Sequence, residues 1–293
     1  MAENESERSS FFKKIRGQES DQEEMSFIDH LEALRWHIIR SVLAIVVAAI
    51  VFFIFIDWIF DNVIMGPTQN NFISYRMLCS LSHHLGMGNS LCMPPMTLNL
   101  QVTSISGTFM SSITIAFVGG IIVAFPYLLW EIWKFVRPAL KPGELKHTRG
   151  VIFWISFFFI LGVAFGYFLL APFTFNFLSN YTIGKANIIL YRPTLTDYLD
   201  SLIDIILGAG LAFELPMASW ILSRMGLITP TFLRNYRKYA YVALLVIAAV
   251  ITPSPDWGSQ MIVVMPLVLL YEISILISAQ VNKNQEKKMK EWS

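Results

Sequence analysis

Six stretches of the chain are apolar over most of the length that a membrane-spanning helix needs. About 20 mostly apolar residues are required to cross a hydrocarbon core of about 30 Å. The pattern therefore predicts an all-α membrane protein with six transmembrane helices, at residues 38–60, 109–130, 151–171, 199–221, 239–251 and 261–277. The fifth and sixth stretches are short, which implies either a locally thin bilayer or polar helical turns that extend them.

A helical periodicity precedes the first stretch. Its apolar positions share one face and are Phe27, Leu31, Leu34 and Ile38, whereas the other face carries Asp29, Glu32 and Arg35. This pattern favours an amphipathic helix in the membrane interface that continues into the first span. Residues 1–25 are polar, of mixed charge and without the apolar segment of a signal peptide, so we expect a disordered cytoplasmic tail. The transmembrane domain is then residues 26–277, and residues 278–293 form a cytoplasmic C-terminal tail.

Composition and charge agree with a polytopic membrane protein. Only 15% of the 293 residues are charged and 55% are apolar, whereas soluble domains carry about 25% charge. The net charge of +1 and the lack of a basic block exclude a nucleic-acid surface. In a six-span topology, one side holds all of the 22 Lys and Arg residues except Arg76, Lys185 and Arg192. Both termini are therefore expected in the cytoplasm.

Both cysteines, Cys79 and Cys92, fall in the first exported loop. In an oxidising compartment a disulfide is the favoured interpretation, and free thiols are the alternative. His83 and His84 lie between them, so a Cys2His2 metal site is a third alternative, but adjacent histidines are poorly spaced as ligands. We expect no metal and no cofactor.

The fourth span contains polar residues at membrane depth. Glu214 lies near its middle, followed by Pro216, and Asp200 lies about 40° from Glu214 on a continuous helical wheel. A carboxylate at that depth costs at least about 2.5–3.5 kcal/mol, so such residues usually face a cavity or a partner. The alternative is a protonated Glu214 that is hydrogen-bonded inside the bundle.

Two turns carry further acidic residues. The second span is followed by Pro138 and a tight turn with Glu144, which on its own is typical of a solvated loop. Asp256 lies between the fifth and sixth spans, where an N-cap of the sixth helix is its simplest role.

Taken together, these patterns resemble the TatC family, the multispanning core of the twin-arginine protein translocase. The resemblance covers roughly residues 26–277. It rests on short motifs in the family's order: His30-Leu31-x-x-Leu34-Arg35, Pro67 after the first span, Phe135-x-x-Pro138-Ala-Leu-x-x-x-Glu144, Phe213-Glu214-x-Pro216, Pro255-Asp256-x-x-Ser259-Gln260, and Pro266 followed by Glu272. One position departs from the family, because its N-terminal glutamate falls at Ala33 and Glu32 is the neighbour.

The resemblance implies a concave, glove-like bundle in the cell inner membrane and a receptor for folded precursors that carry a twin-arginine signal peptide. The implied signal-binding residues are Glu144, Phe135, Glu32, Arg35 and Leu34. Carboxylates suit this task because they accept paired hydrogen bonds from guanidinium groups. Polar residues of the cavity would be Glu214, Asp200 and Gln260. Structural roles would belong to Pro67, Pro138 and Asp256.

The resemblance also implies partners and an energy source. Single-span TatA- and TatB-type proteins would dock against the last two spans, at Thr252, Gln260 and Glu272, and the receptor would self-associate among membrane lipids. The family uses the proton-motive force, and the chain has no GxxxxGK[ST] nucleotide loop.

Two other classes of function are weaker. An ion-coupled transporter would use Glu214 as its ion or proton site, but the two halves of the chain show no inverted repeat. A membrane enzyme is less favoured still, because no nucleophile–base pair or HExxH motif accompanies a span.

Overall fold

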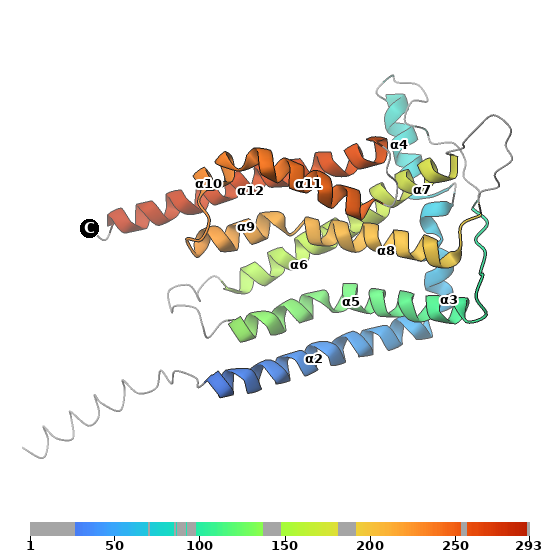
Figure 1. Ribbon diagram of the computed structural model, residues 1–293, viewed down its shortest axis with the longest axis horizontal. Helices are drawn as coiled ribbons and strands as arrows, with labels where there is room; N and C mark the ends of the chain where they lie inside the picture. Colours follow the sequence, from blue (N-terminus) through green and yellow to red (C-terminus); the bar gives the residue numbers. More distant parts are fainter. Residues whose placement is uncertain are drawn as a thin grey trace, which may run out of the picture.

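The computed structural model describes residues 27–69, 71–84, 86, 92, 98–136, 148–180, 192–252 and 257–291. Within these ranges the chain is helical and has no β-strand; its only β-type pairing is an isolated bridge between Gln101 and Thr194. The long helices run side by side along the bundle (Figure 1). The start of α2 and the end of α12 lie at the same end of the bundle, and α3 and α4 lie at the opposite end (Figure 1).

Most of the predicted spans correspond to one helix or to two consecutive ones. The described α-helices are α2 (Phe27–Ile54), α3 (Ile56–Ile59), α4 (Ile73–His84), α5 (Gly107–Val136), α6 (Thr148–Phe165), α7 (Ala171–Asn180), α8 (Leu195–Ala212), α9 (Leu215–Arg224), α10 (Pro230–Asn235), α11 (Arg237–Ile251) and α12 (Trp257–Glu291). A π-helix, η1 (Phe60–Ile64), and a 3-10 turn, η2 (Gly66–Thr68), follow α3, and a second π-helix, η5 (Gly166–Leu170), joins α6 to α7.

Five segments are long and apolar enough to cross a membrane. They are Leu34–Ile54, Gly107–Phe135, Gly150–Asn180, Leu195–Arg224 and Gln260–Lys287. The chain is therefore a multi-pass membrane protein. The predicted fifth span corresponds to α11, whose 15 residues extend about 22 Å at 1.5 Å per residue. A sixth crossing by this short helix and the glove-like outline stay predictions.

Of the two interpretations of the short sixth stretch, the structure shows the extension by polar helical turns, and the span is not short. α12 has 35 residues, and 28 of them form the apolar span Gln260–Lys287. Polar helical turns continue beyond Ile277 because this segment is rich in Gln, Lys and Glu, which have high helix propensity. The predicted boundary between the domain and its C-terminal tail thus falls inside a continuous helix.

The fourth span is not one continuous helix either. α8 ends at Ala212 and α9 begins at Leu215. The amide of Glu214 donates to the Leu211 carbonyl, a bond three residues back, and Pro216 has no N–H to continue the α-helical ladder. On the two sides of this break, α8 packs chiefly against α6, and α9 packs chiefly against α12.

Close helix contacts depend on glycine where backbones meet. A Cβ on Gly120 of α5 would lie 2.8 Å from the backbone nitrogen of Ala49 and 3.0 Å from the carbonyl oxygen of Ile45, both in α2. Packing of small residues is the usual way in which membrane helices approach each other, because lipid removes the hydrophobic driving force between them. The pair α2 and α5 is the most extensive helix contact among the described residues.

The end of the bundle that carries α4 is fixed by buried hydrogen bonds. The Tyr75 hydroxyl donates to the carbonyl oxygens of Pro67 (2.8 Å) and Pro172 (3.3 Å). Pro67 itself is buried in η2. Burial raises the pKa of the Tyr75 hydroxyl to about 12, so it remains a donor at any physiological pH.

Candidate recognition site

Two of the predicted signal-binding residues are exposed on the first turns of α2. The side chains of Arg35 and Glu32 are 65% and 64% exposed, and Nη2 of Arg35 lies 3.8 Å from Oε1 of Glu32. An ion pair this exposed contributes little to stability. Both charged groups can therefore exchange their partner for a ligand at low cost, while Leu34 between them is half-buried.

A buried carboxylate joins α2 to α5 close to that point. Glu131 is 1% exposed; Nδ1 of His37 lies 2.5 Å from its Oε2, and Nζ of Lys134 donates to its Oε1 at 2.9 Å. Both carboxylate oxygens thus have a donor, which is the condition for keeping such a group out of water. Glu131, His37 and Lys134 are called the interhelical polar cluster below.

The sequence analysis missed this cluster. Glu131 is a single acidic residue inside an otherwise apolar stretch, a signal that could have marked it as paired. Its partner could not have been found in the same way, because His37 lies 94 residues away in the chain.

The aromatic candidate Phe135 lies against the cluster. Its ring packs edge-to-face on His37, with centroids 6.3 Å apart and an interplanar angle of 67°. Nearby, Lys134 lies over the exposed ring of Trp130 at 5.1 Å. Exposed tryptophans with basic neighbours are typical of the membrane–water interface. The geometry thus gives one end of α2 and α5 an exposed carboxylate, a half-buried phenylalanine and an aromatic rim.

Three of the predicted residues lie outside the described residues. These are Glu144 and Pro138, which follow the end of α5, and Asp256, which precedes α12. Their predicted roles in binding and in turn structure stay predictions.

The predicted polar stripe along the fourth span needs a correction. The helical wheel that placed Asp200 and Glu214 on one face assumes an unbroken helix, but the helix is broken after Ala212. Glu214 is half-buried at the break, and its Oε1 is buried without a hydrogen-bond partner among the described residues. Asp200 is exposed near the start of α8, where it lines a small polar pocket that does not include Glu214.

The predicted partner-binding residues make contacts inside the bundle. Glu272 of α12 accepts from the Arg237 guanidinium and from the Tyr241 hydroxyl, each at 2.6 Å, and so fastens α11 to α12. The Gln260 side chain donates to the Leu245 carbonyl of α11 at 3.3 Å. Thr252 is buried and donates to the carbonyl oxygen of Ala248 in its own helix.

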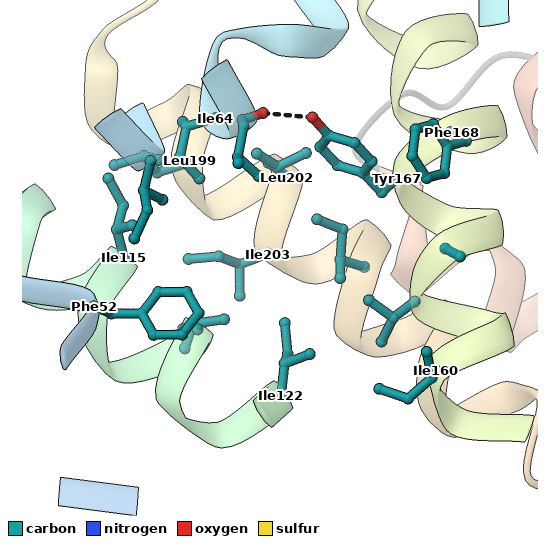
Figure 2. A pocket seen from close by; sticks show the side chains of 17 residues that line it. Phe52, Ile64, Ile115, Ile122, Ile160, Tyr167, Phe168, Leu199, Leu202 and Ile203 are labelled. Carbon is teal, nitrogen blue, oxygen red and sulfur yellow. Dashed lines mark hydrogen bonds between the residues drawn. The ribbon is translucent and has the colours of Figure 1, made fainter. Parts of the chain in front are cut away.

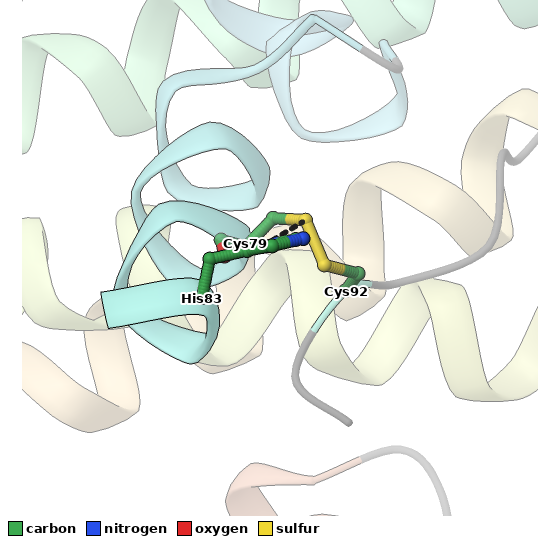
Figure 3. Close-up of a disulfide and its surroundings, with 3 residues drawn as sticks. All are labelled: Cys79, His83 and Cys92. Carbon is green, nitrogen blue, oxygen red and sulfur yellow. Dashed lines mark hydrogen bonds between the residues drawn. A yellow bond between two sulfur atoms is a disulfide. The ribbon is translucent and has the colours of Figure 1, made fainter. Parts of the chain in front are cut away.

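At the opposite end of the bundle, a disulfide joins Cys79 of α4 to Cys92 (Figure 3). Their Cα atoms are 4.4 Å apart. The ligand atoms of Cys79, Cys92 and His83 lie within 4.8 Å of one another, as a metal site would require. However, the sulfur atoms are bonded to each other, and His83 lies 2.7 Å from the Cys79 carbonyl oxygen through Nδ1. A disulfide leaves no thiolate for a metal ion.

A large apolar cavity lies between α5, η5, α6 and α8. Its volume is about 360 Å³. Ile115, Leu199 and Ile64 lie at one end of it and Ile122 and Ile160 at the other (Figure 2). The hydroxyl of Tyr167, its one polar side chain, already donates to the Val63 carbonyl at 2.6 Å. The cavity can therefore hold hydrocarbon and offers no hydrogen bond.

Comparison with known proteins gives a consistent result. A family model described as "Sec-independent protein translocase protein (TatC)" matches residues 29–266. A TatC protein of Blattabacterium is 38% identical over 272 residues, covering 91% of this chain and 99% of that protein. A TatC protein of Carboxydothermus hydrogenoformans is 33% identical and covers 87% of this chain and 93% of its own length.

Solved structures agree with the sequence relatives. A crystal structure titled as the twin-arginine translocase receptor TatC matches with a TM-score of 0.62 and 26% identity, over 86% of this chain and 99% of that one. A second crystal structure, titled as the twin-arginine translocase receptor TatC in DDM, matches with a TM-score of 0.66 and 27% identity, over 85% of this chain and 99% of that one.

Proposed function

The chain belongs to the TatC family of Sec-independent protein translocases, and from this membership we propose that it is the receptor subunit for twin-arginine signal peptides. It recognises folded precursors and exports them across the cell inner membrane with TatA- and TatB-type single-span partners, using the proton-motive force. A role in protein transport rather than catalysis follows from the family. Membership also favours this function over an ion-coupled transporter that uses Glu214.

The exposed Glu32 on α2, the helix whose His37 packs on Phe135, is the observation that carries the proposal. Two guanidinium groups of a signal peptide need carboxylates in water-accessible positions, and Glu32 is 64% exposed with only a weak ion pair to Arg35. Lysine cannot reproduce the planar fork of arginine, which accounts for a receptor that selects paired arginines. Glu144 is the second proposed acceptor, on the resemblance of its motif.

Phe135 gives the same site an apolar contact. Its ring is half-buried and fixed against His37, which is held in turn by Glu131. The interhelical polar cluster therefore holds the aromatic ring in place, while its own charged groups pair with each other and not with the ligand. We propose that the apolar part of the signal peptide packs on this ring, while Leu34 and Arg35 border the arginine-binding carboxylates.

The face of α11 supports docking of a single-span partner. Val242, Val246 and Val250 are 62%, 59% and 75% exposed, and they follow one another at four-residue spacing. We propose that a partner helix packs along this row beside Gln260 and Thr252, with Glu272 holding α11 in place. Glu214 is proposed to face an inserted helix, because its buried Oε1 has no partner among the described residues.

The proposed orientation has both ends of the chain in the cytoplasm. The start of α2 and the end of α12 lie at one end of the bundle, which supports it (Figure 1). Reporters fused after Trp58, Tyr181 or Trp257 should be exported. A cytoplasmic signal from any of the three would contradict the six-span orientation.

Substitution of the carboxylates tests the recognition site. Glu144→Gln should abolish crosslinking of a twin-arginine signal peptide in membranes, because a neutral amide loses the charge-assisted fork. Glu144→Asp should weaken it less, and Glu32→Gln should reduce it if the neighbour of Ala33 does replace the family glutamate. Glu286→Gln, an exposed carboxylate on α12, is the matched control and should be silent.

The substrate provides the second half of the test. Replacing both signal arginines by lysines should impair wild-type crosslinking as much as Glu144→Gln does, and should add little to that variant, because the two changes remove one interaction. Normal crosslinking in Glu144→Gln would reject that residue and leave Glu32 as the acceptor. Normal crosslinking in both variants would reject the site.

A further inference from the structure

Two pockets of opposite character meet at one residue of α8. The apolar cavity of about 360 Å³ and a polar pocket of about 180 Å³ are both lined by Leu199. On α5, Ser111 and Thr114 line the polar pocket, and Ile115, one helical turn after Ser111, lines the apolar cavity. The two pockets therefore follow each other along the groove between α5 and α8.

The polar pocket lies at the outer end of this groove. Its walls include the residues that begin α5 and the first turns of α8, which lie at the end of the bundle where α3 is found (Figure 1). The apolar cavity extends from there toward Ile122 and Ile160, farther along the helices (Figure 2). The order from that end of the bundle inward is thus polar, then apolar.

The polar pocket contains groups without partners. Ser111 is 6% exposed, and among the described residues its hydroxyl has no hydrogen-bond partner. Asp200 likewise has no cation or donor within the described part of the chain. Asp200 is exposed and Ser111 lines the same pocket, so both side chains are available to polar groups of a ligand there. Ser104 and Ser106 complete the rim; their hydroxyls lie 3.3 Å apart and share one hydrogen bond, so one of the two protons is left to donate to an anion.

We propose that this groove binds one phospholipid whose headgroup carries a primary ammonium, as in phosphatidylethanolamine. The ammonium pairs with Asp200, the phosphate accepts from Ser111 and the serine rim at the start of α5, and one acyl chain fills the apolar cavity. The site does not depend on signal-peptide recognition.

Volume distinguishes an acyl chain from a helix as the occupant. A helix with its side chains is about 10 Å wide, whereas the cavity of about 360 Å³ is enclosed between helices that already pack against each other. A chain one methylene wide fits that space. Hydrocarbon is also the solvent around these spans, so the cavity is filled from the bilayer.

Charge selects the headgroup. A choline headgroup carries a positive charge but no N–H to donate, and a glycerol headgroup leaves the lipid with a net negative charge beside Asp200. A primary ammonium both neutralises Asp200 and donates a hydrogen bond to it. A hydrogen bond to a charged group changes the binding constant by about 10-fold to 100-fold.

Native mass spectrometry of the purified full-length chain tests the site. The protein is incubated with equal amounts of dioleoyl phosphatidylethanolamine, phosphatidylcholine and phosphatidylglycerol, and the retained lipid is counted. We expect one phosphatidylethanolamine per chain, favoured at least about 10-fold over the other two. Asp200→Asn should remove this preference, and Asp200→Lys should reverse it toward phosphatidylglycerol.

A second pair of variants tests the acyl chain. Ala164→Leu adds carbons inside the cavity and should lower retention of all three lipids without changing their order. The controls are Asp57→Asn, an exposed carboxylate on α3, and Ala243→Leu, an exposed position on α11; both should bind as the wild type does. Equal retention of the three lipids by the wild type, or an unchanged preference in Asp200→Asn, would overturn the proposal. A co-purified peptide in place of lipid would also overturn it.

Discussion

Replacing His37 by Phe should loosen the contact between α2 and α5. The new ring keeps the edge-to-face packing on Phe135, but the imidazole Nδ1 that meets Glu131 is lost. Oε2 of a carboxylate that is 1% exposed is then left without this donor. The substitution therefore isolates one hydrogen bond of the interhelical polar cluster from the aromatic packing beside it.

The structure sets the size of the effect. Breaking a buried charged pair by removing one partner costs about 3–5 kcal/mol, and a hydrogen bond to a charged group contributes about 1.5–3 kcal/mol. Lys134 remains on the other oxygen of Glu131, but its side chain is 43% exposed and compensates only in part. We expect His37→Phe to lower the free energy of unfolding by about 2 kcal/mol.

A double-mutant cycle measures this interaction directly. Reversible unfolding in mixed micelles is followed for the wild type, His37→Phe, Glu131→Leu and the double variant. The double variant should be more stable than the sum of the single effects predicts, by about 1–2 kcal/mol, because an apolar pair leaves no buried group unpaired. A coupling energy below about 0.5 kcal/mol would refute the reasoning, since independent sites agree within that margin.

Three further predictions concern other contacts. In intact cells Cys79 and Cys92 should react with a thiol reagent only after reduction; immediate labelling of both would reject the disulfide in the native protein. Gly120→Leu should destabilise the chain by more than about 2 kcal/mol in micelle unfolding, since its side chain meets the backbone of α2, whereas Gly150→Leu, with open space around it, should have a small effect. Glu272→Gln should weaken the attachment of α11, seen as faster proteolysis of the segment before α12, and equal rates in variant and wild type would contradict this.

The apolar stretches were sufficient to predict the helical class and the approximate places of the five segments that are long enough to cross a membrane. Helix ends were not predictable, because hydropathy does not register a helix that continues on polar residues, as α12 does beyond Ile277. Pro216 was a sequence signal for the break in the fourth span. The relative directions of Glu214 and Asp200, however, depend on the backbone geometry at the break, which the sequence does not show.

The candidate site was predictable only where residues are neighbours in sequence. Glu32 and Arg35 share one turn of α2, so their proximity follows from helical spacing. Glu131 and His37 meet only because α2 packs on α5, and the pocket at Leu199 exists only because α5 packs on α8. The contacts of Gln260 and Glu272 with α11 likewise depend on the pairing of α11 with α12.

The break after Ala212 divides the molecule mechanically. A continuous helix transmits bending and torsion along its hydrogen-bonded ladder, and this ladder is interrupted where Pro216 lacks an amide proton. α8 packs chiefly with α6, and α9 packs chiefly with α12, so a displacement of α12 acts first on α9. It reaches α8 through the joint at Phe213 and Glu214 and also through α11, which contacts both α12 and α8. The fourth span can therefore bend at this joint, where Glu214 lies, while its two halves stay packed against different helices.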